Sequence, residues 1–224
     1  MGNVMLDLDF LAASDYNRIK CFEEQKTISQ SHLRELGDIY VRTKMHHDYG
    51  AGILHRHFPI REGCVLVHTL HDTDTDVCKV EDVKDLARQN IMPHSFFLNS
   101  NGQFQGYEYY SGVRRPLPNA EFLYQLRSFL INNQLAGRFA ILAEDSRRDS
   151  VEFLLPENQG MVCIPREEED DGQSVITGWK FSEEPDGKIR CVERRGCDPQ
   201  GDGQHNSPPK DRAVGALVTE TSRK

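Results

Sequence analysis

Histidine is concentrated in one stretch of the sequence. Six of the nine histidines lie between positions 46 and 71, where an even distribution over the 224 residues would place about one. Histidine is the commonest neutral metal ligand and the side chain that gains or loses a proton near pH 7. This stretch is therefore where we expect metal binding or acid–base chemistry. Its histidines are His46, His47, His55, His57, His68 and His71.

His55 and His57 are the pair whose spacing best suits a metal ion. Residues i and i+2 of a β-strand point to the same face, so two imidazoles placed this way can take neighbouring positions on one ion. Glu62 follows His57 by five residues. Later histidines offer further ligands, among them His68, with no spacing rule to choose between them. We therefore predict a divalent metal, zinc or iron, bound by His55, His57, Glu62 and His68.

Two other interpretations of these histidines stay open. Leu54, Phe58 and Ile60 would share the opposite face of the same strand. If that face is the core face, His55 and His57 lie on the surface and have no chemical role. Alternatively, one imidazole acts as an acid, a base or a ligand contact without any metal.

The segment around the pair resembles a known metal-binding motif. Gly50-x4-His55-x-His57-x4-Glu62 is similar to the first motif of the cupin superfamily, which uses two histidines, a glutamate and a later histidine. The resemblance implies a metal centre. The sequence departs from the pattern, since the glycine spacing is one residue short, no second cupin motif follows, and helical patterns surround the segment.

A second resemblance covers more of the chain. The run Gly52-Ile53-Leu54-His55-Arg56-His57-Phe58 follows a helix and an Asp-Tyr-Gly loop, and resembles a segment of a family of uncharacterised fungal proteins. The Gly178-Trp179-Lys180-Phe181 strand before a tail with cysteine and histidine is similar as well. The resemblance implies a fungal, intracellular protein and no particular activity.

The cysteines contain no standard zinc motif. Cys191-x5-Cys197-x7-His205, joined by Cys163, has the residue types of a zinc site without the usual spacing. Six cysteines in 224 residues are also too few for a disulfide scaffold. We therefore expect reduced thiols and a location in the cytoplasm or nucleus.

Acidic residues suggest solvated loops rather than a site. Asp72-x-Asp74-x-Asp76 lacks the glycine and the final glutamate of a calcium loop. Glu108, a lone carboxylate in a predicted strand, is expected to be exposed. The sequence contains no glycine-rich phosphate loop, no nucleophile elbow and no HExxH motif.

The elements that must position these residues follow from hydrophobic periodicity. We predict three main helices, near residues 31–45, 80–90 and 119–135. One β-hairpin is predicted between 53–58 and 64–70, and a second between 93–98 and 103–110 around Asn101-Gly102. An antiparallel meander should follow, with strands near 139–143, 151–155, 161–164, 175–181 and 188–192.

These elements predict an α+β fold, with the helices packed on mainly antiparallel strands. Residues 1–195 should form a single domain, and residues 196–224, rich in Gly, Pro, Asp, Gln and Ser, a disordered tail. No apolar run is long enough to span a bilayer. A net charge of −8 and a pI near 5.6 argue against nucleic acid or an anionic membrane as a partner.

Two functions of different classes are compatible with this sequence. The histidine density favours a small metal-dependent enzyme that acts on a small-molecule substrate. The lack of every standard enzyme motif favours a non-catalytic accessory protein that binds a protein partner and has structural histidines. The arrangement of His55 and His57 in space should discriminate between the two functions, because only the first requires a third ligand within reach.

Overall fold

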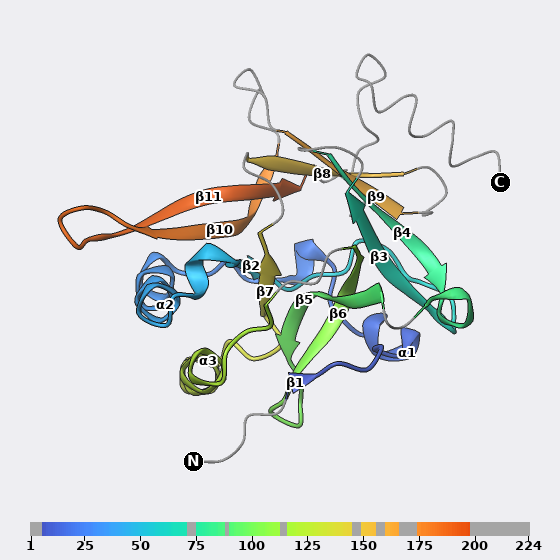
Figure 1. Ribbon diagram of the computed structural model, residues 1–224, viewed down its shortest axis with the longest axis horizontal. Helices are drawn as coiled ribbons and strands as arrows, with labels where there is room; N and C mark the ends of the chain where they lie inside the picture. Colours follow the sequence, from blue (N-terminus) through green and yellow to red (C-terminus); the bar gives the residue numbers. More distant parts are fainter. Residues whose placement is uncertain are drawn as a thin grey trace.

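Eleven strands form one sheet, and ten of them close into a mixed barrel (Figure 1). The computed structural model describes residues 6–70, 75–87, 90–112, 116–144, 149–155, 160–165 and 174–197. Around the ring the order is β6-β3-β4-β9-β8-β11-β10-β2-β7-β5, and the pairing of β5 with β6 closes it. The strands are β2 Tyr49–Ile53, β3 Cys64–Leu70, β4 Asp76–Asp82, β5 Ile91–Leu98, β6 Phe104–Ser111, β7 Phe139–Ala143, β8 Ser150–Leu154, β9 Gly160–Pro165, β10 Val175–Glu183 and β11 Ile189–Cys197.

Most neighbouring strands in this ring are antiparallel, as predicted. The parallel exceptions are β3 with β6, β8 with β11, and the short β1 (Leu6–Asp7), which pairs with β6. The molecule is mostly β, so the α+β prediction was correct only in part.

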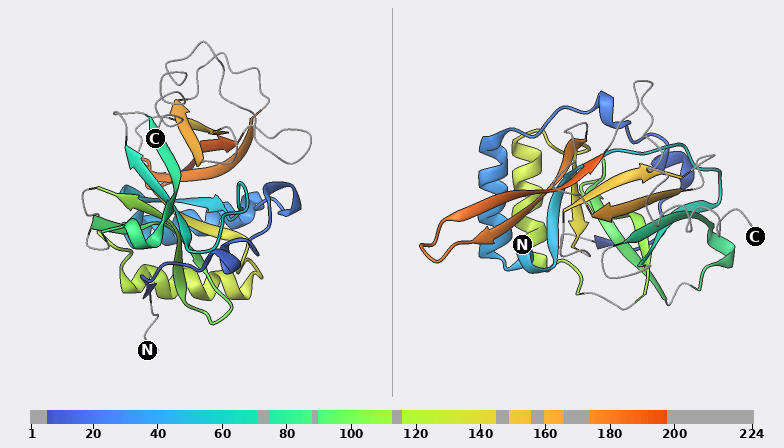
Figure 2. Two further views of the ribbon diagram at one scale, coloured as in Figure 1. Left: turned by 90° about the vertical axis from the view of Figure 1, so that its right-hand side faces the viewer. Right: turned by 90° about the horizontal axis from the view of Figure 1, so that it is seen from above.

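Two substantial helices cover one side of the barrel. Helix α2 (Gln30–Arg42) and helix α3 (Ala120–Asn132) lie side by side there (Figures 1 and 2). Ser29 and Asn119 cap them by accepting a hydrogen bond from the N–H three residues later. Both helices confirm the sequence prediction, because their apolar stripes and polar caps are local signals.

The predicted helix at 80–90 is wrong. Strand β4 continues to Asp82 and is followed by a single 3-10 turn, Val83–Asp85. Val80 to Asp82 pair with β3, and this backbone pairing outweighs a weak helical pattern. The third helix is instead α1, a single turn at Ala13–Tyr16.

The predicted hairpin between 53–58 and 64–70 is also wrong. Strand β2 ends at Ile53 and pairs with β7 and β10, whereas β3 pairs with β4 and β6. After Ile53 the chain leaves the sheet. The N–H of Leu54 donates to the carbonyl of Arg138, and that of Arg56 to the carbonyl of Lys20. Distant segments therefore replace the expected strand partner.

The hairpin between β5 and β6 is confirmed. Their register places Leu98 beside Phe104 across the turn. Gly102 adopts a φ of +72°, a left-handed conformation that glycine takes without strain. The Asn99 side chain accepts hydrogen bonds from the N–H groups of Asn101 and Gln103, which fixes the turn.

All five strands predicted after residue 138 exist, but they do not form a meander. Only β8–β9 and β10–β11 are hairpins, while β7 lies between β2 and β5. Gly196 and Cys197, predicted to lie in the tail, end β11 and are buried. The rest of the predicted tail, 198–224, lies outside the described residues. Within the described ranges, no helix has the length and apolar character to cross a membrane.

Candidate metal centre

Four polar residues stand in a row on neighbouring strands of the barrel. Asp76 on β4 pairs in register with Cys163 on β9, which pairs with Glu152 on β8, which pairs with Cys197 on β11. Register partners in a sheet point to the same face. All four side chains are buried. The row therefore puts two carboxyl groups and two thiols on one side of the sheet, shielded from solvent.

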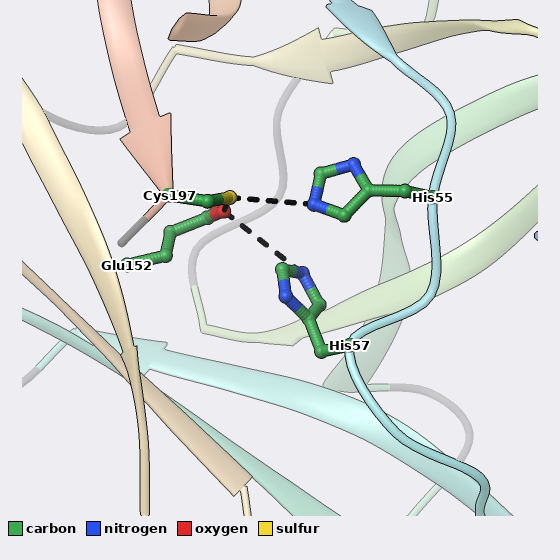
Figure 3. Close-up of side chains that lie close together, drawn as sticks. All are labelled: His55, His57, Glu152 and Cys197. Carbon is green, nitrogen blue, oxygen red and sulfur yellow. Dashed lines mark hydrogen bonds and ion pairs between the residues drawn. The ribbon is translucent and has the colours of Figure 1, made fainter. Parts of the chain in front are cut away.

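His55 and His57 face Glu152 and Cys197 of this row from the irregular segment after β2 (Figure 3). Nδ1 of His55 lies 2.8 Å from the carbonyl oxygen of Ile53, and this oxygen can only accept a hydrogen bond. Nδ1 therefore carries the proton, and Nε2 has the lone pair that a metal needs. That Nε2 lies 3.4 Å from Sγ of Cys197. Nε2 of His57 lies 3.9 Å from Oε2 of Glu152.

These four residues form the first group, His55, His57, Glu152 and Cys197. One ligand atom from each lies within 4.8 Å of all the others. The Cys197 thiol donates a hydrogen bond to Glu152 at 2.9 Å. Metal–ligand distances of about 2.0–2.3 Å place the ligands of a tetrahedral zinc ion about 3.3–3.8 Å apart. The observed separations of 2.9, 3.4 and 3.9 Å lie close to that range.

A second group lies next to the first and contains His68, His94 and Glu108. Nδ1 of His68 lies 2.5 Å from Oδ2 of Asp76, and Nε2 of the same ring lies 3.5 Å from Oε2 of Glu108. The Ser95 hydroxyl donates to Glu108 at 3.1 Å and lies 3.0 Å from Nδ1 of His94. All five residues are buried, and together they form a continuous polar network.

Ring geometry distinguishes the two groups. The rings of His68 and His94 are stacked, with centroids 4.2 Å apart and planes within 11°. A metal lies in the plane of an imidazole that binds it, so an ion bound to one ring would lie above the face of the other. In this arrangement the two rings cannot share an ion. The rings of His55 and His57 are 67° apart, so their lone pairs are free to converge.

The second group is an ion-pair network. Burial by itself raises the pKa of Glu108, but the hydrogen bond and charge of His68 outweigh it and lower the pKa to about 2. Burial lowers the pKa of His68, yet contacts with Cys78 and Asp76 hold it well above its usual range. The Cys78 thiol, with a pKa raised by burial to about 12, is neutral near pH 7. The carboxylates of Asp76 and Glu108, one on each ring nitrogen, are therefore the charges that keep His68 protonated.

Acidic side chains gather in this buried region. Asp76, Glu108 and Glu152 are buried, and they face His68 and Arg195, whose Nη1 lies 3.7 Å from Glu152. Nε2 of His57 lies 3.8 Å from Glu108 and 3.9 Å from Glu152, and the charge of His57 helps to lower the pKa of Glu108. Burial, and then the charge of Glu152, raises the pKa of the Cys197 thiol, so it is neutral without a metal. A divalent cation bound here would take the place of the thiol proton.

The structure separates the four residues predicted as ligands. His55 and His57 come together as expected, and His68 lies in the second group instead. Glu62 is exposed on the turn before β3 and belongs to neither group. The segment with Glu62 connects β2 to β3, two strands that do not pair with each other.

The sequence-based prediction missed or misplaced three residues of the two groups. Glu108, expected to be exposed, is 4% exposed, and Glu152 was not considered at all. Both stand between two large apolar or aromatic residues in a strand, as Tyr-Glu-Tyr and Val-Glu-Phe, and this pattern is the signal that could have found them. Cys197 was considered with Cys191, but these two lie apart, and His205 is outside the described residues.

Comparison with known proteins gives no family for this chain. No protein-family model matches it, and neither a search of curated proteins nor a search of solved structures found a match. The similarities to the first cupin motif and to fungal proteins are therefore limited to the residues that carry them.

Proposed function

We propose that the protein binds one zinc ion through His55, His57, Glu152 and Cys197, and that this ion is a structural part of the barrel. The observation that carries the proposal is the convergence of four buried ligand atoms within 4.8 Å, contributed by three separate chain segments. The hydrogen bond from His55 to the Ile53 carbonyl supports it, because ligating histidines are usually oriented by such a partner.

The ligand set favours zinc over iron. A thiolate is a soft ligand that zinc accepts readily, and zinc imposes no geometry beyond the tetrahedron that four ligands make. Iron(II) enzymes with two histidines and one carboxylate instead keep coordination positions open. In the proposed centre Cys197 occupies such a position.

The same feature favours a structural ion over a catalytic one. Structural zinc sites are closed by four protein ligands, whereas catalytic sites leave one position to water or substrate. All four proposed ligands are at most 7% exposed. A closed centre offers a small-molecule substrate no position on the metal, so a protein partner is the ligand that we expect for the molecule.

Metal analysis of untagged protein tests the proposal. After dialysis the protein should retain about one equivalent of zinc, and His57→Ala and Cys197→Ala should lose it, because each removes a ligand. His47→Ala is the matched control, since His47 is exposed and its ring stacks only on His46 among the contacts described. Wild-type protein without metal after reconstitution would refute the proposal.

A metal-dependent enzyme is the second candidate. One observation favours it: Oε1 of Glu108 lies 3.8 Å from Nε2 of His57, the distance at which a carboxylate could orient a water on the ion. The cobalt(II)-substituted protein discriminates between the candidates. Azide should leave the visible spectrum of a closed centre unchanged, and a shifted spectrum would establish an open position and favour the enzyme.

A further inference from the structure

The β10–β11 hairpin is joined to the rest of the barrel along two short seams. Among the described residues, strand β11 pairs with β8 through Arg195–Cys197 beside Ser150–Glu152, which we call the β8–β11 seam. In the same residues, strand β10 pairs with β2 at Gly178 and Trp179. Within the hairpin, by contrast, pairing extends from Val175 to Glu183. Few described residue pairs therefore join this hairpin to its two neighbouring strands.

The proposed ligands lie at these two seams. Glu152 and Cys197 are register partners in the β8–β11 seam. His55 and His57 directly follow β2, the strand that forms the other seam. One ion would thus join chain segments up to 142 residues apart. A link between residues so far apart in sequence lowers the conformational entropy of the open chain more than a local link does.

From this placement we infer that the metal ion holds the barrel closed, and that its removal opens the β8–β11 seam while the two-helix side stays folded. The inference rests on the proposed function and adds a conformational consequence to it. Without the ion, the described backbone pairs at the two seams are the three of β8–β11 and the two of β10–β2. The ion would link the segments that meet there, and a short ladder without this link opens to water more readily than the longer ladder within the hairpin.

The half of the β10–β11 hairpin that lies away from the seams packs against helix α2. Phe181 is fully buried against α2, and a Cβ built on Gly37 of that helix would lie 2.8 Å from Cγ2 of Ile189. This close packing does not involve the metal ligands. Opening should therefore stop at the seam and leave the contact between α2 and the hairpin intact. The metal-free protein would then carry two free strand edges, on β8 and β11, which can pair with another extended chain.

Hydrogen exchange of the wild-type protein, with zinc and after chelation, tests the inference. Backbone amides at 150–152 and 195–197 should exchange at least tenfold faster after chelation. Amides of α2 and α3 should keep their rates. Cys197→Ala that has been dialysed to remove weakly held zinc should show the fast pattern, and Cys191→Ala, on the same strand and treated the same way, should not.

Each other outcome overturns the inference. If zinc binds and the seam amides exchange at unchanged rates, the ion does not close the ring, and the proposed function stands without this inference. If chelation accelerates exchange in α2 and α3 as much as at the seam, the protein unfolds globally rather than opening. If metal analysis finds no zinc, both the inference and the proposed function are wrong.

Discussion

Replacement of Cys197 by alanine should reduce the stabilising effect of zinc and leave the metal-free protein nearly as stable as before. Cys197 is fully buried and is a neutral thiol without a metal, because burial, and then the charge of Glu152, raises its pKa. Cys197→Ala in chelator therefore removes one sulfur atom and no charge. We expect this to lower the free energy of unfolding by about 1 kcal/mol.

With zinc the expected difference is larger. Free zinc at about 1,000 times its Kd stabilises a native protein by about 4.1 kcal/mol. If loss of the thiolate weakens binding about 100-fold, the same zinc concentration is only about ten times the Kd and contributes about 1.4 kcal/mol. The difference of about 2.7 kcal/mol corresponds to about 5–11 °C in Tm for a domain of this size.

Thermal unfolding followed by circular dichroism measures this difference. The quantity to compare is the rise in Tm from chelator to zinc, for wild type, Cys197→Ala and Cys191→Ala. Cys191 lies on the same strand, is half-buried and touches no proposed ligand among the described contacts, so its variant should keep the full rise. An equal rise in wild type and Cys197→Ala would refute the assignment of Cys197 as a ligand.

Three further predictions follow from the same geometry. The Kd for zinc should fall about tenfold between pH 7 and pH 8, because the pKa of Cys197 is raised and its proton competes with the metal. A Kd that does not change with pH in a chelator competition would exclude Cys197 as a ligand. Metal analysis should find one ion rather than two, since the stacked rings of His68 and His94 cannot share an ion, and a second tightly held equivalent would contradict this. Asp76→Asn should lower the free energy of unfolding by about 3 kcal/mol at pH 6. The pKa of His68 is raised in the folded protein, so the ion pair stabilises fully below the unfolded-state pKa of about 6.5 and loses this effect as pH rises through the folded-state pKa. The cost of Asp76→Asn should therefore be smaller at pH 9. Equal costs in urea denaturation at both pH values would count against the pair.

The sequence alone was sufficient where the signal is local. The apolar stripes of α2 and α3 define the two helices, Asn119 marks the start of α3, and the turn with Gly102 defines the β5–β6 hairpin. The five strands after residue 138 were also found from their alternation. The pairing of His55 and His57 with each other needed only their spacing of two, although they lie on an irregular segment and not on a strand.

Only the tertiary structure decided which strands are neighbours and which residues complete the centre. Strand order depends on backbone pairing between segments far apart in sequence, and nothing in β8 or β11 alone specifies that Glu152 lies beside Cys197. That register in turn brings both to His55, which is 142 residues away from Cys197. Glu62, although close to His57 in sequence, is turned to solvent because its loop joins strands that belong to different parts of the ring. A metal centre built across a closed sheet is set by the sum of such long-range pairings, and no spacing rule along the chain encodes it.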